Sequence, residues 1–258
     1  MIRVVKIGGN VVDNPEALTR FVKAFASMEA PKILVHGGGK EATRLSEALG
    51  IETKMIEGRR VTDRQTLDVV TEVYAGLINK RIVAMLQAEC CNAIGLSGAD
   101  ANIIKAKRRN PNPIDYGYVG DINPADVNSD VLNALLNSGL VPVFCAITHD
   151  GDGTLLNCNA DSVASAIALG ASRIDKTDLI YCFEQPGVML DIDDPNSLLE
   201  ILKPKSFTEL KEQGIVSKGM IPKLKNSFDA IAGGVNSVII QHADAIGTEK
   251  GTKLLPDD

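Results

Sequence analysis

Two short apolar runs in this chain each end in a cluster of glycines. Residues 4–9 read VVKIGG, and residues 33–39 read ILVHGGG. A short apolar run that stops at glycine is typical of a buried strand. Consecutive glycines leave backbone N–H groups open to an anion, and a helix that starts there adds partial positive charge. The pair therefore predicts two phosphate-handling turns, with Lys6 beside the first.

Strand-like and helix-like segments alternate along almost the whole chain. Asn14-Pro15 starts a helix whose apolar positions recur at helical spacing, so residues 2–35 predict a βαβ unit. Further strands are predicted at 93–96, 141–147, 179–183 and 237–240. Further helices are predicted at 42–49, from Asp63 to about residue 82, and at 129–137, 161–169 and 222–232, with a hairpin outside the main layer at 102–122. The pattern indicates an α/β fold, a three-layer α/β/α sandwich around a mainly parallel open sheet, with ligands at the carboxyl ends of its strands.

Composition limits the class of protein. The 258 residues are 45% hydrophobic and 23% charged, as in an ordinary globular chain. No apolar run approaches the roughly 20 residues that span a bilayer, and the first residues lack a signal-peptide pattern. We therefore expect a cytoplasmic protein with no membrane partner. The net charge of −6 disfavours binding to nucleic acid.

Standard nucleotide motifs do not fit the glycine turns. Glu41 stands where a P-loop needs Ser or Thr, and no GxGxxG follows a strand. A hydrolase is the competing enzyme class, because residues 95–99, GLSGA, nearly match the nucleophile elbow GxSxG and His242 follows late in the chain. Its last glycine is missing, however, and Ser97 precedes a loop where the elbow requires a helix.

Several other segments occur in a recognisable order. They read GRRVT at 58–62, DYGYVGD at 115–121, LNCNAD at 156–161, GMIPK at 219–223 and GTKL at 251–254. Together with the two glycine turns they resemble the amino acid kinase family, and within it the N-acetylglutamate kinases most closely. The resemblance covers nearly the whole chain. It implies that ATP phosphorylates the side-chain carboxylate of an N-acylated glutamate, a step toward arginine or ornithine.

The resemblance also implies roles for individual residues. Lys6 and Lys223 would stabilise the transferring phosphoryl group from two sides, and Asp161 would hold both ammonium groups. Mg2+ would arrive with ATP, bound chiefly by phosphate oxygens and water, without a dedicated protein metal site. The expected contacts of the acylglutamate are Gly38, Gly39, Arg60, Asn157 and Asn159, and those of the nucleotide are Gly8, Gly9, Glu184 and Gly187.

Each of these residues also has an ordinary structural interpretation. Asn159 could be only the N-cap of the helix that follows, and Asp161 could only complement that helix's dipole. Arg60 alone could form a surface ion pair, and Lys223 could lie on a solvated helix face. Only their joint occurrence in the family's order favours the functional interpretation.

One segment departs from the family pattern. Family members usually carry Thr-Asp or Ser-Asp before a Pro-Gly or Ser-Gly turn, whereas residues 183–188 here read FEQPGV. Phe183 removes a hydroxyl, while Glu184 can still accept hydrogen bonds. We therefore expect altered contacts to the nucleotide. This departure keeps open a non-catalytic metabolite sensor as an alternative of another class.

The resemblance further implies two lobes in one sheet. Residues 1–172 would bind the acylglutamate and dimerise, and residues 173–258 would bind the nucleotide. Arginine-inhibited members carry a helix ahead of the first strand, but here the strand begins at Ile2. We therefore expect a homodimer insensitive to arginine, paired partly through the helix from Asp63. N-succinylglutamate or another acyl-amino acid remains an alternative substrate.

Overall fold

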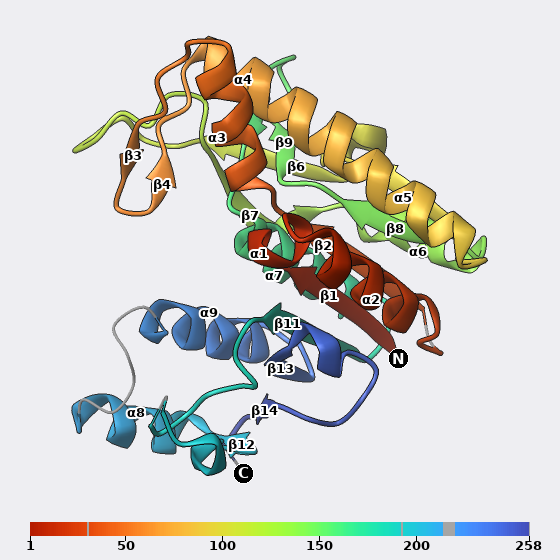
Figure 1. Ribbon diagram of the computed structural model, residues 1–258, viewed down its shortest axis with the longest axis vertical. Helices are drawn as coiled ribbons and strands as arrows, with labels where there is room; N and C mark the ends of the chain where they lie inside the picture. Colours follow the sequence, from red (N-terminus) through yellow and green to blue (C-terminus); the bar gives the residue numbers. More distant parts are fainter. Residues whose placement is uncertain (30, 192, 214–219, 258) are drawn as a thin grey trace.

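An eight-stranded sheet runs through the chain (Figure 1). The computed structural model describes residues 1–29, 31–191, 193–213 and 220–257. The strand order is β12-β14-β13-β11-β1-β2-β8-β5, and every neighbouring pair is parallel except β13 and β14. The strands are β1 (Ile2–Ile7), β2 (Lys32–His36), β5 (Ala93–Leu96), β8 (Val141–Phe144), β11 (Thr177–Phe183), β12 (Ile201–Leu202), β13 (Ser237–His242) and β14 (Thr252–Leu254).

Helices cover both faces of this sheet, which confirms the predicted α/β class. Crossover connections between parallel strands are right-handed. The connections from β1 to β2 and from β2 to β5 therefore place their helices on one face of the sheet. The connections that run back across the sheet from β5 to β11 and β13 place their helices on the other face. The first group is α1 (Gly9–Val12), α2 (Pro15–Ala26), α3 (Gly39–Ala48), α4 (Arg64–Thr71) and α5 (Asn79–Ala88). The second is α6 (Ser129–Asn137), α7 (Ala160–Ala171), α8 (Pro204–Glu212) and α9 (Ile221–Ala232), of which α7 packs on β1 and β11 and α9 on β13.

Most predicted elements form where local signals were strong. Asn14 caps α2, accepting hydrogen bonds from the backbone N–H groups of Glu16 and Ala17 at 3.0 Å each. The βαβ unit at the start of the chain is confirmed, as is α6 over 129–137. The long helix from Asp63 is also confirmed, and a π-helical segment, Glu72–Ile78, joins α4 to α5 within it.

The prediction of one strand over 141–147 was wrong. β8 ends at Phe144, and β9 (Ile147–His149) belongs to a second, four-stranded sheet with the order β10-β9-β6-β7. Cys145 and Ala146 between them are buried and apolar, so no turn residue marks the break. In this sheet β6 (Ile104–Arg108) and β7 (Gly120–Val127) form the predicted hairpin outside the main layer, and β10 is Leu155–Asn157. A two-stranded hairpin, β3 (Met55–Ile56) and β4 (Arg59–Arg60), was not predicted.

The strand register brings both glycine turns to one edge of the sheet. Ile7, the last residue of β1, lies opposite His36 on β2 and Cys182 on β11. The carboxyl ends of these three strands therefore meet, and Gly8 and Gly37 follow directly from two of them. Within the described part of the chain, no helix is both long and apolar enough to cross a membrane.

Candidate active site

Lys6 and Asp161 form an ion pair at the shared edge of β1 and α7. The Lys6 Nζ atom lies 2.6 Å from Asp161 Oδ1, and the two side chains are 10% and 24% exposed. Asp161 stands in the first turn of α7, two residues after the N-cap Asn159. Partial burial strengthens the attraction between the two charges because less water screens them.

Lys223 approaches the same place from the first turn of α9. Its Nζ atom lies 3.7 Å from the centre of the Phe183 ring, and the Nζ atom of Lys6 lies 5.5 Å from that centre. Burial lowers the pKa of Lys223, with the Asp161 carboxylate opposing the shift and the Lys6 charge adding to it. The two amines thus share one electrostatic environment. Gly219, which begins the predicted 219–223 segment, lies outside the described residues.

A cavity of about 370 Å³ opens beside these amines. It lies between the β1 turn, the end of β11 and α9, and its lining includes Lys6, Gly8, Gly9, Asn10, Phe183, Glu184, Gly187 and Lys223. Glu184 is exposed there. Gly187 is closely packed, since a Cβ would lie 2.5 Å from Thr252 Oγ1 and 2.7 Å from Leu198 Cδ1. Gly187 therefore allows close packing against Thr252 and Leu198, and it also lines the cavity.

A second cavity, of about 250 Å³, also adjoins the first glycine turn. Its lining includes Gly9, Gly38, Gly39, Arg59, Arg60, Tyr74, Asn157 and Asn159. Gly9 lines both cavities. Two ligands, one in each, would therefore face one another across the β1 turn.

Arg60 is buried in the wall of this second cavity, with 8% of its surface exposed. Its Nη1 donates to Thr53 Oγ1 at 3.1 Å, and its Nη2 donates to the Gly39 carbonyl at 2.9 Å and to Thr43 Oγ1 at 2.8 Å. The Tyr74 side chain also hydrogen-bonds to Arg60. These contacts fix the guanidinium in the cavity wall.

The two asparagines of the LNCNAD segment line this cavity with different local partners. Asn157 ends β10, is 7% exposed, and donates from Nδ2 to Thr62 Oγ1 at 3.0 Å. Asn159 caps α7, its Oδ1 accepting from the backbone N–H groups of Asp161 at 2.8 Å and Ser162 at 3.2 Å. Asn159 is therefore the N-cap of α7, and it also lines the cavity.

The second glycine turn has one position that excludes a side chain. A Cβ on Gly38 would lie 2.2 Å from Ile78 Cδ1 and 3.2 Å from Tyr74 Cδ1 on the long helix. A Cβ on Gly39 would meet nothing within 4 Å. Gly38 thus permits close approach of the turn to the helix, while Gly39 faces open space next to the cavity.

His36 is buried beneath this turn. Its Nδ1 lies 2.8 Å from the Gly37 carbonyl, and its Nε2 lies 3.1 Å from Asn79 Nδ2. Burial lowers the pKa of His36 to about 4. The imidazole is therefore neutral near pH 7 and acts as a structural support of the turn.

The structure separates the residues of the competing hydrolase hypothesis. Ser97 follows β5, and its Oγ donates to Asp100 Oδ2 at 2.8 Å. His242 ends β13, and four strands lie between β5 and β13 in the sheet. Five strand spacings place the two residues roughly 24 Å apart, too far for a serine–histidine pair.

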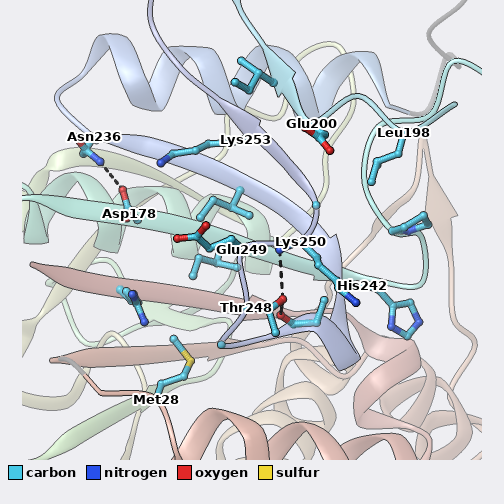
Figure 2. A pocket seen from close by; sticks show the side chains of 18 of the residues that line it. Met28, Asp178, Leu198, Glu200, Asn236, His242, Thr248, Glu249, Lys250 and Lys253 are labelled. Carbon is cyan, nitrogen blue, oxygen red and sulfur yellow. Dashed lines mark hydrogen bonds between the residues drawn. The ribbon is translucent and has the colours of Figure 1, made fainter. Parts of the chain in front are cut away.

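A larger cavity of the described chain is not lined by the amines of Lys6 and Lys223 or by Asp161. It has a volume of about 1080 Å³ and is lined by residues including Asp178, Glu200, Asn236, Glu249, Lys250 and Lys253. Figure 2 shows these side chains on the sheet near the loop that follows β13. Size therefore does not identify the candidate active site.

Three features of the site were not predicted from the sequence. Tyr74, on the long helix from Asp63, lines the cavity beside Arg60. Phe183 was noted only for the hydroxyl that it lacks. Lys40 hydrogen-bonds to Asn10, which links the two glycine turns. Only Lys40 had a sequence signal, a charged residue directly after the second turn.

Comparisons with known proteins identify the family of this chain. Residues 1–242 match the model of the amino acid kinase family. The chain is 54% identical over 259 residues to a Cytophaga hutchinsonii protein named acetylglutamate kinase, covering 98% of this chain and 97% of that protein. A Phocaeicola vulgatus protein of the same name is 48% identical, with 98% of each chain covered. A crystal structure of a Streptococcus mutans protein superposes with a TM-score of 0.77 at 25% identity, covering 99% of both chains. The chain belongs to the amino acid kinase family.

Proposed function

We propose that this protein transfers the γ-phosphoryl group of ATP to the side-chain carboxylate of N-acetyl-L-glutamate, a step in arginine or ornithine biosynthesis. The observation that carries the proposal is the meeting of Lys6, Asp161 and Lys223 beside Gly9, where the two cavities adjoin. The name shared by the Cytophaga and Phocaeicola relatives supports the same substrate.

The residues fit the needs of phosphoryl transfer. A carboxylate oxygen forms the new bond to the γ-phosphorus while the bond to the β,γ-bridging oxygen breaks, and ADP leaves with that electron pair. No general base is needed, since a glutamate side chain is already ionised at neutral pH. Catalysis then consists of alignment and charge stabilisation, which two amines and the backbone N–H groups of Gly8, Gly9, Gly38 and Gly39 can supply.

The second cavity is the proposed seat of the acylglutamate. The Arg60 guanidinium would bind its α-carboxylate, with a planar arrangement of donors that lysine cannot reproduce. Asn157 and Asn159 would bind the amide of the acyl group. All residues that line this cavity come before residue 161, which supports an acylglutamate-binding lobe at 1–172.

The cavity beside Lys223 is the proposed seat of the nucleotide phosphates. Its lining combines the first glycine turn with Glu184, Gly187 and α9. The nucleotide lobe, residues 173–258, would thus share its phosphate site with β1 of the first lobe. Mg2+ would enter with ATP and be held mainly by phosphate oxygens and water.

A second substrate, N-succinylglutamate, is favoured by one residue. Arg59 lines the acylglutamate cavity beside Arg60, its side chain is exposed, and the described chain offers it no ion-pair partner. A succinyl group carries an extra carboxylate, which this guanidinium could pair. Arg59→Leu would then reduce activity with the succinyl substrate much more than activity with the acetyl substrate.

We further propose a cytoplasmic homodimer. All five cysteines are free thiols, and four of them are buried, as in proteins of a reducing compartment. Leu77, on the long helix from Asp63, is 45% exposed and would be covered by a partner helix. Light scattering of the purified protein should give twice the chain mass. A monomer or a stable hexamer would contradict the pairing.

Trapping of the acyl phosphate tests the proposed reaction. The protein is incubated with ATP, Mg2+ and hydroxylamine, together with N-acetylglutamate, N-succinylglutamate or free glutamate. We expect hydroxamate and ADP in equal amounts with an acylated glutamate and none with free glutamate. Binding of acylglutamate without ATP binding and without hydroxamate would support the sensor alternative and reject the kinase.

A further inference from the structure

The ring of Phe183 lies near both amines of the candidate active site. Its centre is 3.7 Å from Lys223 Nζ and 5.5 Å from Lys6 Nζ, both within the range of a cation–π contact. Phe183 is the last residue of β11 and is only partly buried, so its ring borders the phosphate cavity. The phenyl ring at this position therefore contacts functional groups as well as the hydrophobic core.

The Phe183 ring attracts the Lys223 ammonium without forming an ion pair with it. Asp161 is already paired with Lys6 at 2.6 Å, and the ion pairs of the described chain do not include Lys223. A second carboxylate would neutralise the Lys223 ammonium and occupy its N–H donors. The π face of a ring attracts the ammonium without accepting its proton or cancelling its charge. The full charge stays available to a phosphoryl group.

A second aromatic ring fixes the orientation of Phe183. Tyr181 stacks on it with ring centres 5.9 Å apart and an angle of 15° between the planes. The Tyr181 hydroxyl donates to the backbone carbonyl of Asp161 at 3.3 Å. The two rings thus connect the first turn of α7 to the amine of Lys223, which reaches the site from a different helix.

We propose that Phe183 is a positioning residue that holds the Lys223 ammonium over its ring, fully charged and aimed at the phosphate cavity. This inference rests on the proposed kinase function and adds a residue to its machinery. It also assigns a role to the difference from the family pattern at residues 183–188, because Phe183 stands where family members carry a hydroxyl side chain.

Two substitutions separate the ring's π face from its bulk. Phe183→Leu keeps an apolar side chain but removes the π face, and we expect kcat to fall about tenfold, the loss that corresponds to one partly desolvated cation–π contact. The KM for N-acetylglutamate should stay within about twofold, because the acylglutamate binds in the other cavity. Phe183→Tyr keeps the π face and should retain most of kcat. Equal loss in both variants, or no loss in Phe183→Leu, would overturn the proposal.

Graded fluorination of the ring is a sharper test, because fluorine withdraws electron density from the π face with little change in shape. Mono-, di- and trifluorophenylalanine are introduced at position 183, and the logarithm of kcat should fall steadily with each fluorine. The matched control is Phe228, which lies on the same helix as Lys223 and contacts Phe207, 5.6 Å away between ring centres. Fluorination there should leave kcat unchanged.

The outcomes distinguish this inference from the proposed function. If kcat stays constant across the fluorinated variants of position 183, the role of the ring is rejected and the kinase function remains intact. Absence of hydroxamate from the unmodified protein would reject the kinase function itself. A parallel decline at positions 183 and 228 would indicate a general effect on folding and would also reject the positioning role.

Discussion

The Nζ atom of Lys6 on β1 lies 2.6 Å from the Asp161 carboxylate at the start of α7. The pair is mostly buried and joins two segments that are far apart in the sequence. Lys223 adds a second amine within electrostatic reach of the same carboxylate. One negative charge thus lies near two positive ones, which leaves net positive charge where a phosphoryl group would transfer.

Removing the Lys6 amine should abolish most turnover. We expect Lys6→Met to lower kcat about 100-fold to 1000-fold, as the loss of one preorganised charged donor does. Circular dichroism should show an unchanged fold. In a double-mutant cycle, Lys6→Met and Asp161→Asn should be strongly non-additive, since each already breaks the same ion pair. Simple additivity would contradict a shared role.

Two lysines of α9, Lys223 and Lys225, allow a test substitution and its control to be made on the same helix. Lys223 lies over the Phe183 ring, whereas Lys225 is exposed two residues later. Lys223→Met should lower kcat by about two orders of magnitude, because it removes the second amine. Lys225→Met should leave kcat unchanged. Steady-state kinetics of both variants checks this, and similar kcat values for the two would remove Lys223 from the mechanism.

Much of this site could be predicted from the sequence, because its backbone features have local causes. Glycine clusters after apolar runs mark the two turns, and the pairing of Ile7 with His36 brings them together as parallel strands require. An Asn before a helix start predicts the N-cap at Asn159. Periodicity likewise located most helices and strands.

The remaining features depend on contacts between distant segments. The break between β8 and β9 was missed because Cys145 and Ala146 continue the apolar run, and only pairing with β10 and β6 reveals a second sheet. The place of Phe183 over Lys223 depends on how α9 meets β11. No local pattern carries that information, since a partly buried phenylalanine at a strand end is ordinary.

Gly38 and Gly39 should respond differently to alanine. Gly38→Ala would place its Cβ 2.2 Å from Ile78 Cδ1, so we expect about 1–3 kcal/mol of destabilisation and a displaced turn. Gly39→Ala meets open space and should change the free energy of unfolding by less than about 0.5 kcal/mol. Urea unfolding of both variants measures the difference. Equal stabilities would contradict the close approach of the turn to the long helix.

Arg60→Lys should weaken binding of the acylglutamate. Lysine keeps the charge but loses the planar fork, so the KM for N-acetylglutamate should rise at least about tenfold while the KM for ATP stays nearly constant. Initial-rate kinetics with each substrate varied in turn separates the two constants. A rise confined to the KM for ATP would place the acylglutamate elsewhere.

The buried His36 predicts a pH dependence of stability. Its folded pKa is about 4, below the ordinary 6.5, so the unfolded chain takes up this proton first as the pH falls. Its contribution is fully present above pH 6.5 and is lost progressively down to about pH 4. From pH 8 to 5.5 the loss is about 1.4 kcal/mol. Urea unfolding of wild type and His36→Gln at both pH values should show a smaller drop in the variant, and an equal drop would contradict a buried neutral imidazole.

The proposed catalysis requires that amines from β1 and α9 meet over the terminal phosphate of ATP. A crystal structure with a non-hydrolysable ATP analogue, Mg2+ and N-acetylglutamate measures this directly. We predict that Lys6 Nζ and Lys223 Nζ both lie within hydrogen-bond distance of γ-phosphate oxygens, with the acylglutamate carboxylate facing the phosphorus across Gly9. A terminal phosphate that contacts neither amine would contradict the account.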